Sequence, residues 1–427
     1  MQAVTITPND LTGTVQVPAS KSLCHRAVIC AALAEGTSHL THVSMSEDIE
    51  ATCRVMRGLG VQIEGRSEQL TVRGTALNVQ QKPLDCGESG STLRFAIPLA
   101  LLTDQPVMFV GRGKLTTRPL QTYYELFEQQ HIQYQNTKGA LPLIVKGKLK
   151  GDTFTMRGDV SSQFVSGLMF ALPLLQEDSV ISLIPPVQSI GYIDLTMDAM
   201  QTFGVKVEKI DEKTYHIKGG QLYQPTSYEV EGDFSQAAFW LVAGVLGQQI
   251  TVTGLNLNSK QGDRAIVKIL TSMGANLVEQ DGQIIAMPSK LHGTVIDAAQ
   301  CPDLVPVLAA AAAVSEGQTI IKNAERLRIK ECDRLAAMCT ELNKLGACVT
   351  ETADGLVIEG KPSLTGGLTD SWNDHRIAMA LAAVSMKATA PITINGSESV
   401  NKSYPNFWTH FTLLHGNCKI VEGLVKA

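Results

Sequence analysis

Residues 20–36 read SKSLCHRAVICAALAEG: a small polar cluster, a run of small apolar residues, then a glycine. The same order, with either a glycine or a polar residue at the break, returns five more times in the 427-residue chain. The other copies are GESGSTLRFAIPLALLTD (87–104), VSSQFVSGLMFALPLLQED (160–178), DFSQAAFWLVAGVLGQQ (233–249), CPDLVPVLAAAAAVSEG (301–317) and NDHRIAMALAAVSMKAT (373–389). Their anchor residues Ser22, Ser91, Ser162, Ser235, Asp303 and His375 are 69, 71, 73, 68 and 72 positions apart. The chain is therefore six versions of one repeat.

A second helix is expected in each repeat, closed in most copies by a glycine. Glycine supplies the left-handed backbone that ends a helix, so its recurrence marks the same turn. The glycines are Gly60, Gly204, Gly274, Gly346 and Gly416, and Gln130-His131 stands at the corresponding place in the second copy. A period of roughly 70 residues suits a small αβ subdomain better than a solenoid repeat. Six repeats make two halves of three, with a break predicted in the turn-rich residues 219–228.

The first helix of each repeat is dense in Ala, Val, Leu and Gly, which predicts a helix buried on all sides. The second helices carry more charge and are expected to be half exposed. Chemistry is expected where the buried helices start, because unpaired N–H groups and the helix dipole favour anions there.

The totals exclude several classes of protein. Apolar residues are 44% and charged residues 18% of the chain, as in a globular protein with a sizeable core. A net charge of −5 argues against a broad nucleic-acid or membrane face. Nine scattered cysteines without a CxxC favour a reducing compartment, and we expect a cytoplasmic protein.

Signals for targeting, membranes and metals are missing from the sequence. The first 20 residues do not read as a signal peptide. The alanine-rich residues 304–314 are too few to span a bilayer and predict a buried helix. Without HExxH or histidines at ligand spacing, no metal site is expected.

Each polar cluster also has a plain structural explanation. A serine or aspartate at a helix start is often a cap worth about 1 kcal/mol. Residues 326–334, RLRIKECDR, read as a solvated helical face with Glu331 and Arg334 paired at i,i+3. Lys21, Ser22 and Arg26 share one helical face and suit a phosphate or carboxylate equally well.

These clusters, taken in order, resemble the EPSP synthase family of enolpyruvyl transferases. The matching motifs are SKSxxxR, ESGSTxR, VSSQF, GYID, PD, RIKExDR, NDHR and NKSYP, in phase with the repeat between about residues 17 and 408. The resemblance implies an α/β fold of two domains, each of three βαβαββ units, an inside-out α/β barrel. It places one domain at residues 20–230 and the other at 1–19 plus 231–427, with the active site in the cleft between them.

The family transfers the enolpyruvyl group of phosphoenolpyruvate to the 5-hydroxyl of shikimate 3-phosphate and releases phosphate, on the route to chorismate and the aromatic amino acids. By resemblance, the residues for phosphoenolpyruvate are Lys21, Gly90, Arg118, Gln163, Arg334, Arg376 and Lys402. The residues for shikimate 3-phosphate are Lys21, Ser22, Arg26, Ser161, Ser162, Gln163, Ser189, Tyr192, Asp303, Arg326 and Lys330.

The resemblance also assigns catalytic roles. Asp303 is the base for the 5-hydroxyl, because a carboxylate among cations stays ionised. Glu331 and Lys21 are alternatives for proton delivery, and His375 orients either the departing phosphate or Glu331. The family implies neither a metal nor an organic cofactor, and we expect a monomer.

Three positions depart from the pattern of many relatives. Arg326 replaces an Asn, Glu88-Ser89-Gly90-Ser91 replaces Asn-Ala-Gly-Thr, and Phe95 replaces a Pro. Glu88 near an anion site is expected to point away or to pair with a cation such as Arg94. The family is the target of glyphosate, and these residues touch the part of the site that the inhibitor shares, so the sequence does not predict sensitivity.

Two other interpretations remain. A UDP-N-acetylglucosamine enolpyruvyl transferase has the same six-repeat fold, but would show Lys-Asn at positions 21–22 and a cysteine in the second-repeat loop. A non-catalytic protein that binds anions or RNA ends is the other. The acidic balance and the presence of Asp303 and Glu331 argue against it.

Overall fold

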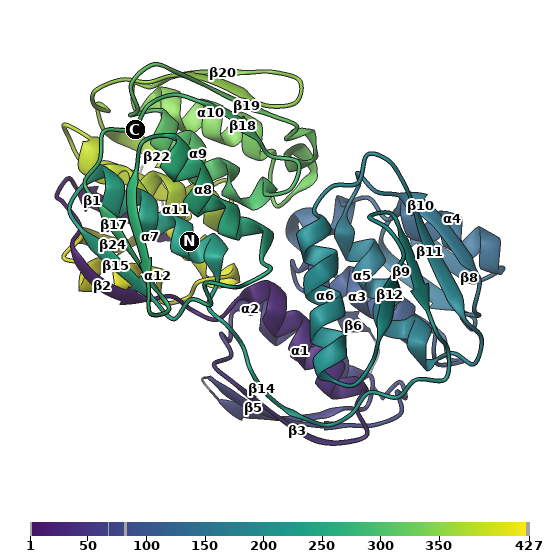
Figure 1. The fold of residues 1–427 in the computed structure, drawn as a ribbon. Helices are drawn as coiled ribbons and strands as arrows, with labels where there is room; N and C mark the ends of the chain where they lie inside the picture. The colour runs from purple at the N-terminus through teal and green to yellow at the C-terminus, as the bar shows by residue number, and fades with distance from the viewer. Residues whose placement is uncertain (1, 67, 81–82, 424–427) are drawn as a thin grey trace. The chain divides into compact units, whose positions relative to one another are not determined.

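The computed structural model describes residues 2–66, 68–80 and 83–423 (Figure 1). The chain forms two compact units. The N-terminal domain runs from Ala19 to Val230. The C-terminal domain combines the residues up to Pro18 with those from Glu231 onward.

The described part of the N-terminal domain contains three four-stranded sheets. In each, the outer first pair is parallel and the other pairs are antiparallel, as expected for a βαβαββ repeat. The sheets are β14 (Ser227–Glu229), β3 (Gly36–Thr41), β5 (Gln69–Gly74), β4 (Gln62–Arg66); β6 (Leu84–Asp85), β7 (Val107–Val110), β9 (Ala140–Lys146), β8 (Gln133–Thr137); and β10 (Thr153–Arg157), β11 (Ser179–Ile184), β13 (Thr214–Ile217), β12 (Val207–Lys209).

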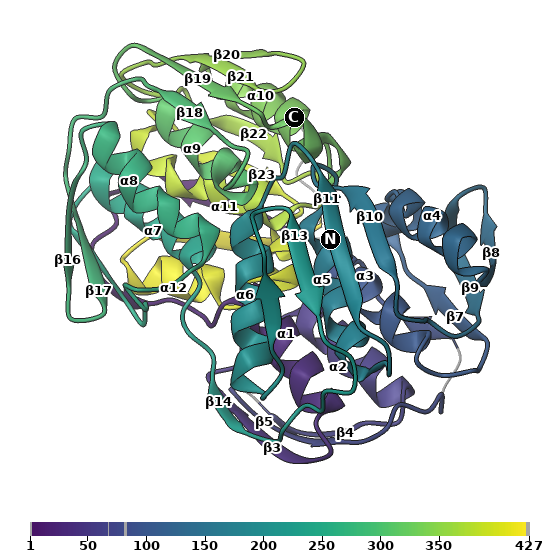
Figure 2. The same ribbon diagram turned by 45° about the vertical axis from the view of Figure 1, so that its right-hand side comes forward.

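Six α-helices accompany these sheets in the described residues: α1 (Lys21–Leu33), α2 (Glu47–Gly58), α3 (Gly90–Ala100), α4 (Gln121–Gln130), α5 (Ser162–Ala171) and α6 (Ile190–Thr202), with short 3-10 turns η1 (Gly113–Thr117) and η2 (Leu172–Leu174). Both ribbon views place α1, α3 and α5 inside the domain and the sheets on its outside (Figures 1 and 2). Helix α6 begins at Ile190, so the GYID motif at residues 191–194 lies within it.

The C-terminal domain repeats this plan with two strands borrowed from the chain start. Its sheets are β2 (Gly13–Gln16), β15 (Ile250–Thr253), β17 (Gln283–Met287), β16 (Asn276–Gln280); β18 (Val295–Asp297), β19 (Gln318–Lys322), β21 (Leu356–Glu359), β20 (Cys348–Glu351); and β22 (Gly367–Asp370), β23 (Ile392–Asn395), β1 (Gln2–Thr7), β24 (Asn417–Glu422). Its helices are α7 (Phe234–Leu246), α8 (Ala265–Ser272), α9 (Val305–Ala312), α10 (Arg334–Lys344), α11 (His375–Ala383) and α12 (Phe407–Leu413), with 3-10 turns η3 (Gly262–Arg264), η4 (Pro302–Leu304), η5 (Glu325–Ile329), η6 (Ser385–Lys387) and η7 (Ser397–Lys402).

The predicted burial of the first helices is confirmed. Every residue of α7, α9 and α11 is buried. In α1, α3 and α5 the only residues that are not fully buried are Lys21, Ser22, Ser91 and Gln163. All four lie at helix starts, so the surface of these helices is kept for the positions where an anion site was expected.

The turns that close the second helices follow the sequence pattern with one exception. Gly60, Gly204, Gly274 and Gly346 have φ of +96°, +81°, +97° and +81°. His131 takes the same left-handed conformation at φ +54°. In the sixth copy the prediction is wrong: His415 is left-handed at φ +66°, and Gly416 is not. Gly416 instead lies so close to the Phe411 ring that a Cβ would be 2.2 Å from it.

Candidate functional site

Lys21 and Ser22 open α1, where an anion would meet the free end of the helix. Ser20 caps this helix by position but makes no side-chain capping bond. The Lys21 Nζ lies 2.9 Å from Asp48 Oδ2, and the two side chains are only 15% and 12% exposed. Asp48 lies in the first turn of α2 and holds the lysine beside the start of α1.

Arg26 is 2% exposed and ties α1 to α5 and α6. Its guanidinium donates to Thr196 Oγ1 at 2.8 Å, to the Tyr192 carbonyl at 2.8 Å and to the Ser22 carbonyl at 2.7 Å. A weaker contact reaches Ser166 Oγ at 3.4 Å. Guanidinium has five N–H groups, so these four contacts leave one for a ligand.

A second cation, Arg118, lies at the start of α3. Arg118 is 6% exposed, and its Nη1 would lie 2.5 Å from a Cβ at Gly90. Only glycine therefore lets the guanidinium rest against the helix start. Gln163 joins the group, because its amide donates to Ser91 Oγ at 2.8 Å and its carbonyl oxygen accepts from Arg94 at 2.7 Å.

The structure shows the surroundings of Glu88 and Phe95, which differ from the family pattern, and of Arg94, the expected partner of Glu88. Arg94 also lies over the Phe164 ring, 4.9 Å from its centroid. The Glu88 carboxylate lies against Gly113, where a Cβ would be 2.6 Å from its carboxyl carbon. Phe95 is 1% exposed and packs edge-on against Phe170, within helix α3, which continues through Pro98 to Ala100.

Two further serine positions lie at the starts of α5 and α6. Ser161 caps α5 by accepting from the Gln163 N–H at 3.3 Å, and Ser162 is 8% exposed. Ser189 is 3% exposed in a left-handed conformation with φ +57°, unusual for a residue other than glycine. Tyr192 follows, half-buried, with its N–H bonded to the Ser189 carbonyl at 3.1 Å.

In the C-terminal domain, Asp303 forms the centre of a charge cluster. Its Oδ1 accepts from Arg334 Nη1 at 3.0 Å, and its Oδ2 accepts from Arg376 Nη2 at 3.0 Å. The Lys330 Nζ is 3.8 Å from Oδ1. The Asp303 carboxylate is therefore engaged with cations, and α9 has no side-chain capping bond at its start. The simple capping explanation fails.

Arg334 is 1% exposed and bonds three carboxylates. Besides Asp303, it donates to Glu331 Oε2 at 2.7 Å and, through Nε, to Asp374 Oδ2 at 2.7 Å. Glu331 precedes α10, so residues 326–334 are not one solvated helical face, and this plain structural explanation of the cluster does not hold. The i,i+3 pairing was right, but it is made by a buried arginine.

Helix α11 is fixed by the same network. Asp374 is fully buried and caps α11 by accepting from the Arg376 N–H at 2.8 Å. The Arg376 guanidinium also donates to the Asp303 carbonyl at 3.1 Å and to Ser235 Oγ at 3.3 Å. Ser235 in turn donates to Asp263. The fourth repeat thus supports the arginine of the sixth.

The remaining predicted residues lie around this cluster. Lys402 is 5% exposed, and its Nζ donates to the Asn373 carbonyl at 2.7 Å. Trp372 and Asn373 are both left-handed at φ +54°, a strained turn that aims this carbonyl. His375 is 1% exposed with Nδ1 3.8 Å from Asp374 Oδ1, and Arg326 donates to the Ala299 carbonyl at 2.7 Å.

Burial and charge set the ionisation of the cluster. Burial would raise the pKa of Asp303, but Arg376, Lys330 and Arg334 outweigh it and hold the pKa well below its ordinary value. Burial lowers the pKa of Lys330 to about 8, against the opposing effect of Asp303. At neutral pH the site thus contains an ionised carboxylate and several cations.

Sequence reasoning missed Asp48 and gave no role to Asp374. Both are carboxylates that hold a predicted cation from another segment, Lys21 from 27 positions away and Arg334 from 40. Only the presence of an acid at a helix start marked either of them, and that signal has a simpler explanation as a cap.

The described residues 2–66, 68–80 and 83–423 contain no cluster of three or more His, Cys, Asp or Glu side chains arranged to hold a metal. Among these residues there is also no helix with the length and apolar character to cross a bilayer.

The fold is that of the enolpyruvyl transferases. The solved enolpyruvyl transferase NikO from Streptomyces tendae has the same fold with a TM-score of 0.81, at 17% identity and 98% coverage of both chains.

The chain belongs to the family described as EPSP synthase (3-phosphoshikimate 1-carboxyvinyltransferase), which it matches over residues 6–411. It is 53% identical to the 3-phosphoshikimate 1-carboxyvinyltransferase of Clostridium kluyveri over 417 residues, covering 97% of this chain and 98% of the relative. The EPSP synthase structure from Acinetobacter baumannii matches with a TM-score of 0.84 at 28% identity, covering 99% and 100% of the two chains. The matches give no support to the nucleotide-sugar interpretation.

Proposed function

We propose that this protein transfers the enolpyruvyl group of phosphoenolpyruvate to the 5-hydroxyl of shikimate 3-phosphate and releases inorganic phosphate. One observation carries the proposal: cations and hydroxyls meet at the buried helix starts within each domain, in a chain that belongs to the EPSP synthase family. Each substrate brings a phosphate and a carboxylate, which match these groups.

The proposed active site takes residues from both domains. In the N-terminal domain, the residues proposed to bind phosphoenolpyruvate are Lys21, Gly90, Arg118 and Gln163. Those proposed to bind shikimate 3-phosphate are Lys21, Ser22, Arg26, Ser161, Ser162, Gln163, Ser189 and Tyr192. In the C-terminal domain, Arg334, Arg376 and Lys402 serve phosphoenolpyruvate, and Asp303, Arg326 and Lys330 serve shikimate 3-phosphate.

The proposed reaction is an addition followed by an elimination. Asp303 takes the proton of the 5-hydroxyl, whose oxygen bonds to C2 of phosphoenolpyruvate while C3 gains a proton from Glu331 or Lys21. The tetrahedral product then loses phosphate from C2 and a proton from the new methyl group, which restores the double bond. His375 orients the departing phosphate or Glu331.

Asp303 needs release before it acts as a base. With both oxygens 3.0 Å from arginines, its lowered pKa makes it a weak proton acceptor. Arg334 and Arg376 are both assigned to phosphoenolpyruvate. Binding of that anion therefore competes for the two arginines and restores the basicity of Asp303 when the acceptor is in place.

The proposed catalytic unit is a single cytoplasmic chain, since one chain supplies every assigned residue and its nine cysteines suit a reducing compartment. The test is phosphate release from phosphoenolpyruvate with three additions: shikimate 3-phosphate, UDP-N-acetylglucosamine, or buffer. We expect release with the first alone. Release only with the nucleotide sugar, or none with shikimate 3-phosphate, overturns the proposal.

A further inference from the structure

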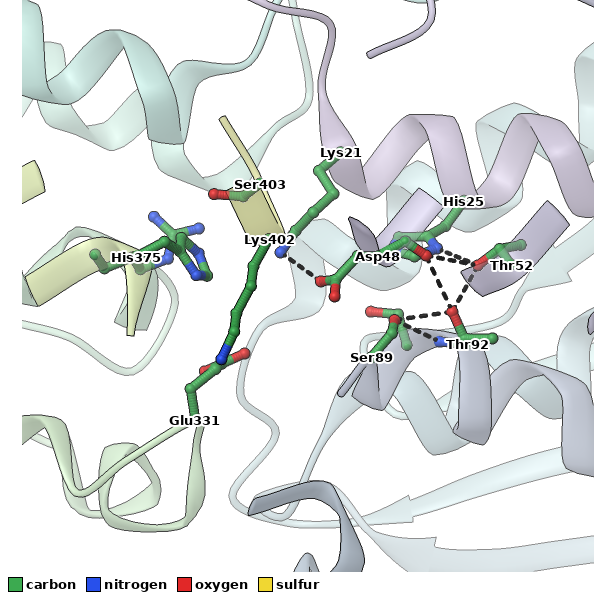
Figure 3. A network of polar contacts seen from close by, with 12 residues as sticks. Lys21, His25, Asp48, Thr52, Ser89, Thr92, Glu331, His375, Lys402 and Ser403 are labelled. Carbon is green, nitrogen blue, oxygen red and sulfur yellow. Dashed lines mark hydrogen bonds and ion pairs between the residues drawn. The ribbon is translucent and has the colours of Figure 1, made fainter. Parts of the chain in front are cut away.

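A row of buried hydrogen-bonding side chains joins helices α1 and α2 to the start of α3 in the N-terminal domain (Figure 3). It runs from His25 of α1 through Thr52 of α2 to Thr92 and Ser89 at the start of α3. The His25 Nδ1 is 2.7 Å from Thr52 Oγ1, which is 2.6 Å from Thr92 Oγ1, which is 2.8 Å from Ser89 Oγ. All four residues are at most 1% exposed.

The protons of this row have a direction. Burial, with Lys21 and Arg26, lowers the pKa of His25 well below its ordinary value, so the ring is neutral and has one donor and one acceptor. Its Nε2 is buried without a hydrogen-bond partner in the part of the chain that the structure describes. A buried N–H without a partner is rarer than a bare acceptor, so the proton belongs on Nδ1. His25 then donates to Thr52, Thr52 to Thr92, and Thr92 to Ser89.

The row contacts Asp48, the ion-pair partner of Lys21, at one point and the turn before Gly90 at another. Both threonine hydroxyls lie 3.4 Å from the Asp48 carbonyl, and the carboxylate of Asp48 holds Lys21. At the other end, Ser89 caps α3 by accepting from the Thr92 N–H at 3.2 Å, directly before Gly90.

Capping alone does not require this arrangement. Ser89 and the Thr92 N–H complete the cap, whereas His25 and the two hydroxyls add polar groups that must all be satisfied in a buried place. Apolar side chains would fill the same volume at less cost. The row therefore does something other than close the helix, and the elements it joins are those that present Lys21 and Gly90.

We propose that His25, Thr52 and Thr92 are positioning residues that fix the Lys21–Asp48 pair relative to the Gly90 turn, and thereby set the affinity for phosphoenolpyruvate. The inference rests on the proposed function, because only there do Lys21 and Gly90 serve that substrate.

The test uses Thr52→Val and Thr92→Val, which keep side-chain shape and remove the hydroxyl. The matched control is Thr103→Val, since Thr103 is also buried and its Oγ1 donates to Ala100 at 2.8 Å, away from the row. We expect KM for phosphoenolpyruvate to rise about fivefold, the size of one lost neutral hydrogen bond, with KM for shikimate 3-phosphate changed far less. Thr52→Ser restores the hydroxyl and should restore KM.

A second readout needs no activity. The rate at which an amine-reactive reagent modifies Lys21, followed by peptide mass spectrometry, should rise about threefold or more in both valine variants as the ion pair loosens. Lys209, held 2.9 Å from Asp194 in the same domain, is the internal reference and should not change.

The outcomes separate the two proposals. Faster Lys21 modification in a protein that shows no transferase activity supports the positioning role and overturns the proposed function. Unchanged KM and unchanged Lys21 reactivity, relative to Thr103→Val, overturn the positioning role. Should the valine variants not fold, Thr52→Ala, which removes the same hydroxyl without a branched apolar side chain, is compared with Thr103→Ala in both readouts: a raised KM with faster Lys21 modification supports the positioning role, and no change in either rejects it.

Discussion

Asp303 is bound on both oxygens by arginines, so replacing it has two separate effects. We expect Asp303→Asn to lower turnover at least about 10²-fold, as for loss of a general base. The Asn oxygen still accepts from one arginine, so the protein should fold, with a lower melting temperature. Asp297→Asn in the same domain is the control, because its carboxylate accepts from the Ala299 N–H and from the Asn323 amide, both neutral donors. Near-normal turnover in Asp303→Asn would remove its role as base.

Lys330 gives the site a pH limit. Its pKa of about 8 means that the charge is present below that pH and lost above it. The affinity of the free protein for shikimate 3-phosphate should therefore fall as the pH rises through about 8. Calorimetric titrations from pH 6.5 to 9.5 check this, with Lys330→Met losing the pH dependence and Lys322→Met keeping it.

The same shift affects folding in the opposite sense. The folded protein binds this proton less tightly than the unfolded chain does, so the cost to stability is present below about pH 8 and disappears towards the ordinary pKa of 10.5. The free energy of unfolding of Lys330→Met near pH 7 should therefore differ from that of the unchanged protein. Equal values would contradict this explanation.

Gly90 has a steric role. An added Cβ would lie 2.5 Å from Arg118 Nη1 and 3.2 Å from Arg94 Nη1, so one guanidinium must move. The displaced atom is the end of a flexible side chain, so the effect on folding should be small, but a moved guanidinium loses a bond to the bound anion, and we expect Gly90→Ala to raise KM for phosphoenolpyruvate roughly tenfold. Initial-rate kinetics check this, with the melting temperature as the control for a general loss of packing. An unchanged KM would show that Arg118 does not serve that substrate.

At this scale the sequence predicted charged residues better than their partners. Lys21 and Arg376 were marked by their place at the start of a buried helix, and Arg334 was assigned only through the family resemblance. Their partners Asp48, Asp374 and Ser235 were not. Asp48 reaches Lys21 from the second helix of the same repeat, Asp374 and Ser235 reach their arginines from another repeat, and each pairing depends on packing rather than on spacing.

Helix α4, the second helix of the second repeat, ends at a histidine where most other repeats have a glycine. His131 is left-handed at φ +54°, a conformation that costs a residue with a Cβ about 1 kcal/mol. His131→Gly should therefore raise the free energy of unfolding by about that amount, with no effect on kinetics. Urea denaturation measures it. His131→Ala removes the same side chain but keeps the Cβ, so an equal gain in that variant would contradict the backbone explanation.

The element pattern was predictable because the repeat fixes both period and burial. Six small-residue runs predicted the six inner helices, and glycines predicted four of the six closing turns. The sixth turn was not predictable. His415 takes the left-handed position, and Gly416 is retained by the close approach of Phe411, which only the folded chain reveals.

For the whole molecule, the chain crosses between domains twice, after Pro18 and after Val230. Strands β1 and β2 complete sheets of the C-terminal domain, and β14 completes one in the N-terminal domain. The assigned cations come from both domains, so we predict that ligands draw the domains together. Small-angle scattering should show a smaller radius of gyration with shikimate 3-phosphate and an inhibitor than without them, and an unchanged radius would count against closure.

³¹P NMR of an equimolar mixture of phosphoenolpyruvate and shikimate 3-phosphate follows the proposed transfer directly. We predict that both substrate signals fall together while inorganic phosphate and one new phosphorylated product grow in equal amounts. Inorganic phosphate that grows while the shikimate 3-phosphate signal stays constant, or a mixture that does not change, would contradict the account.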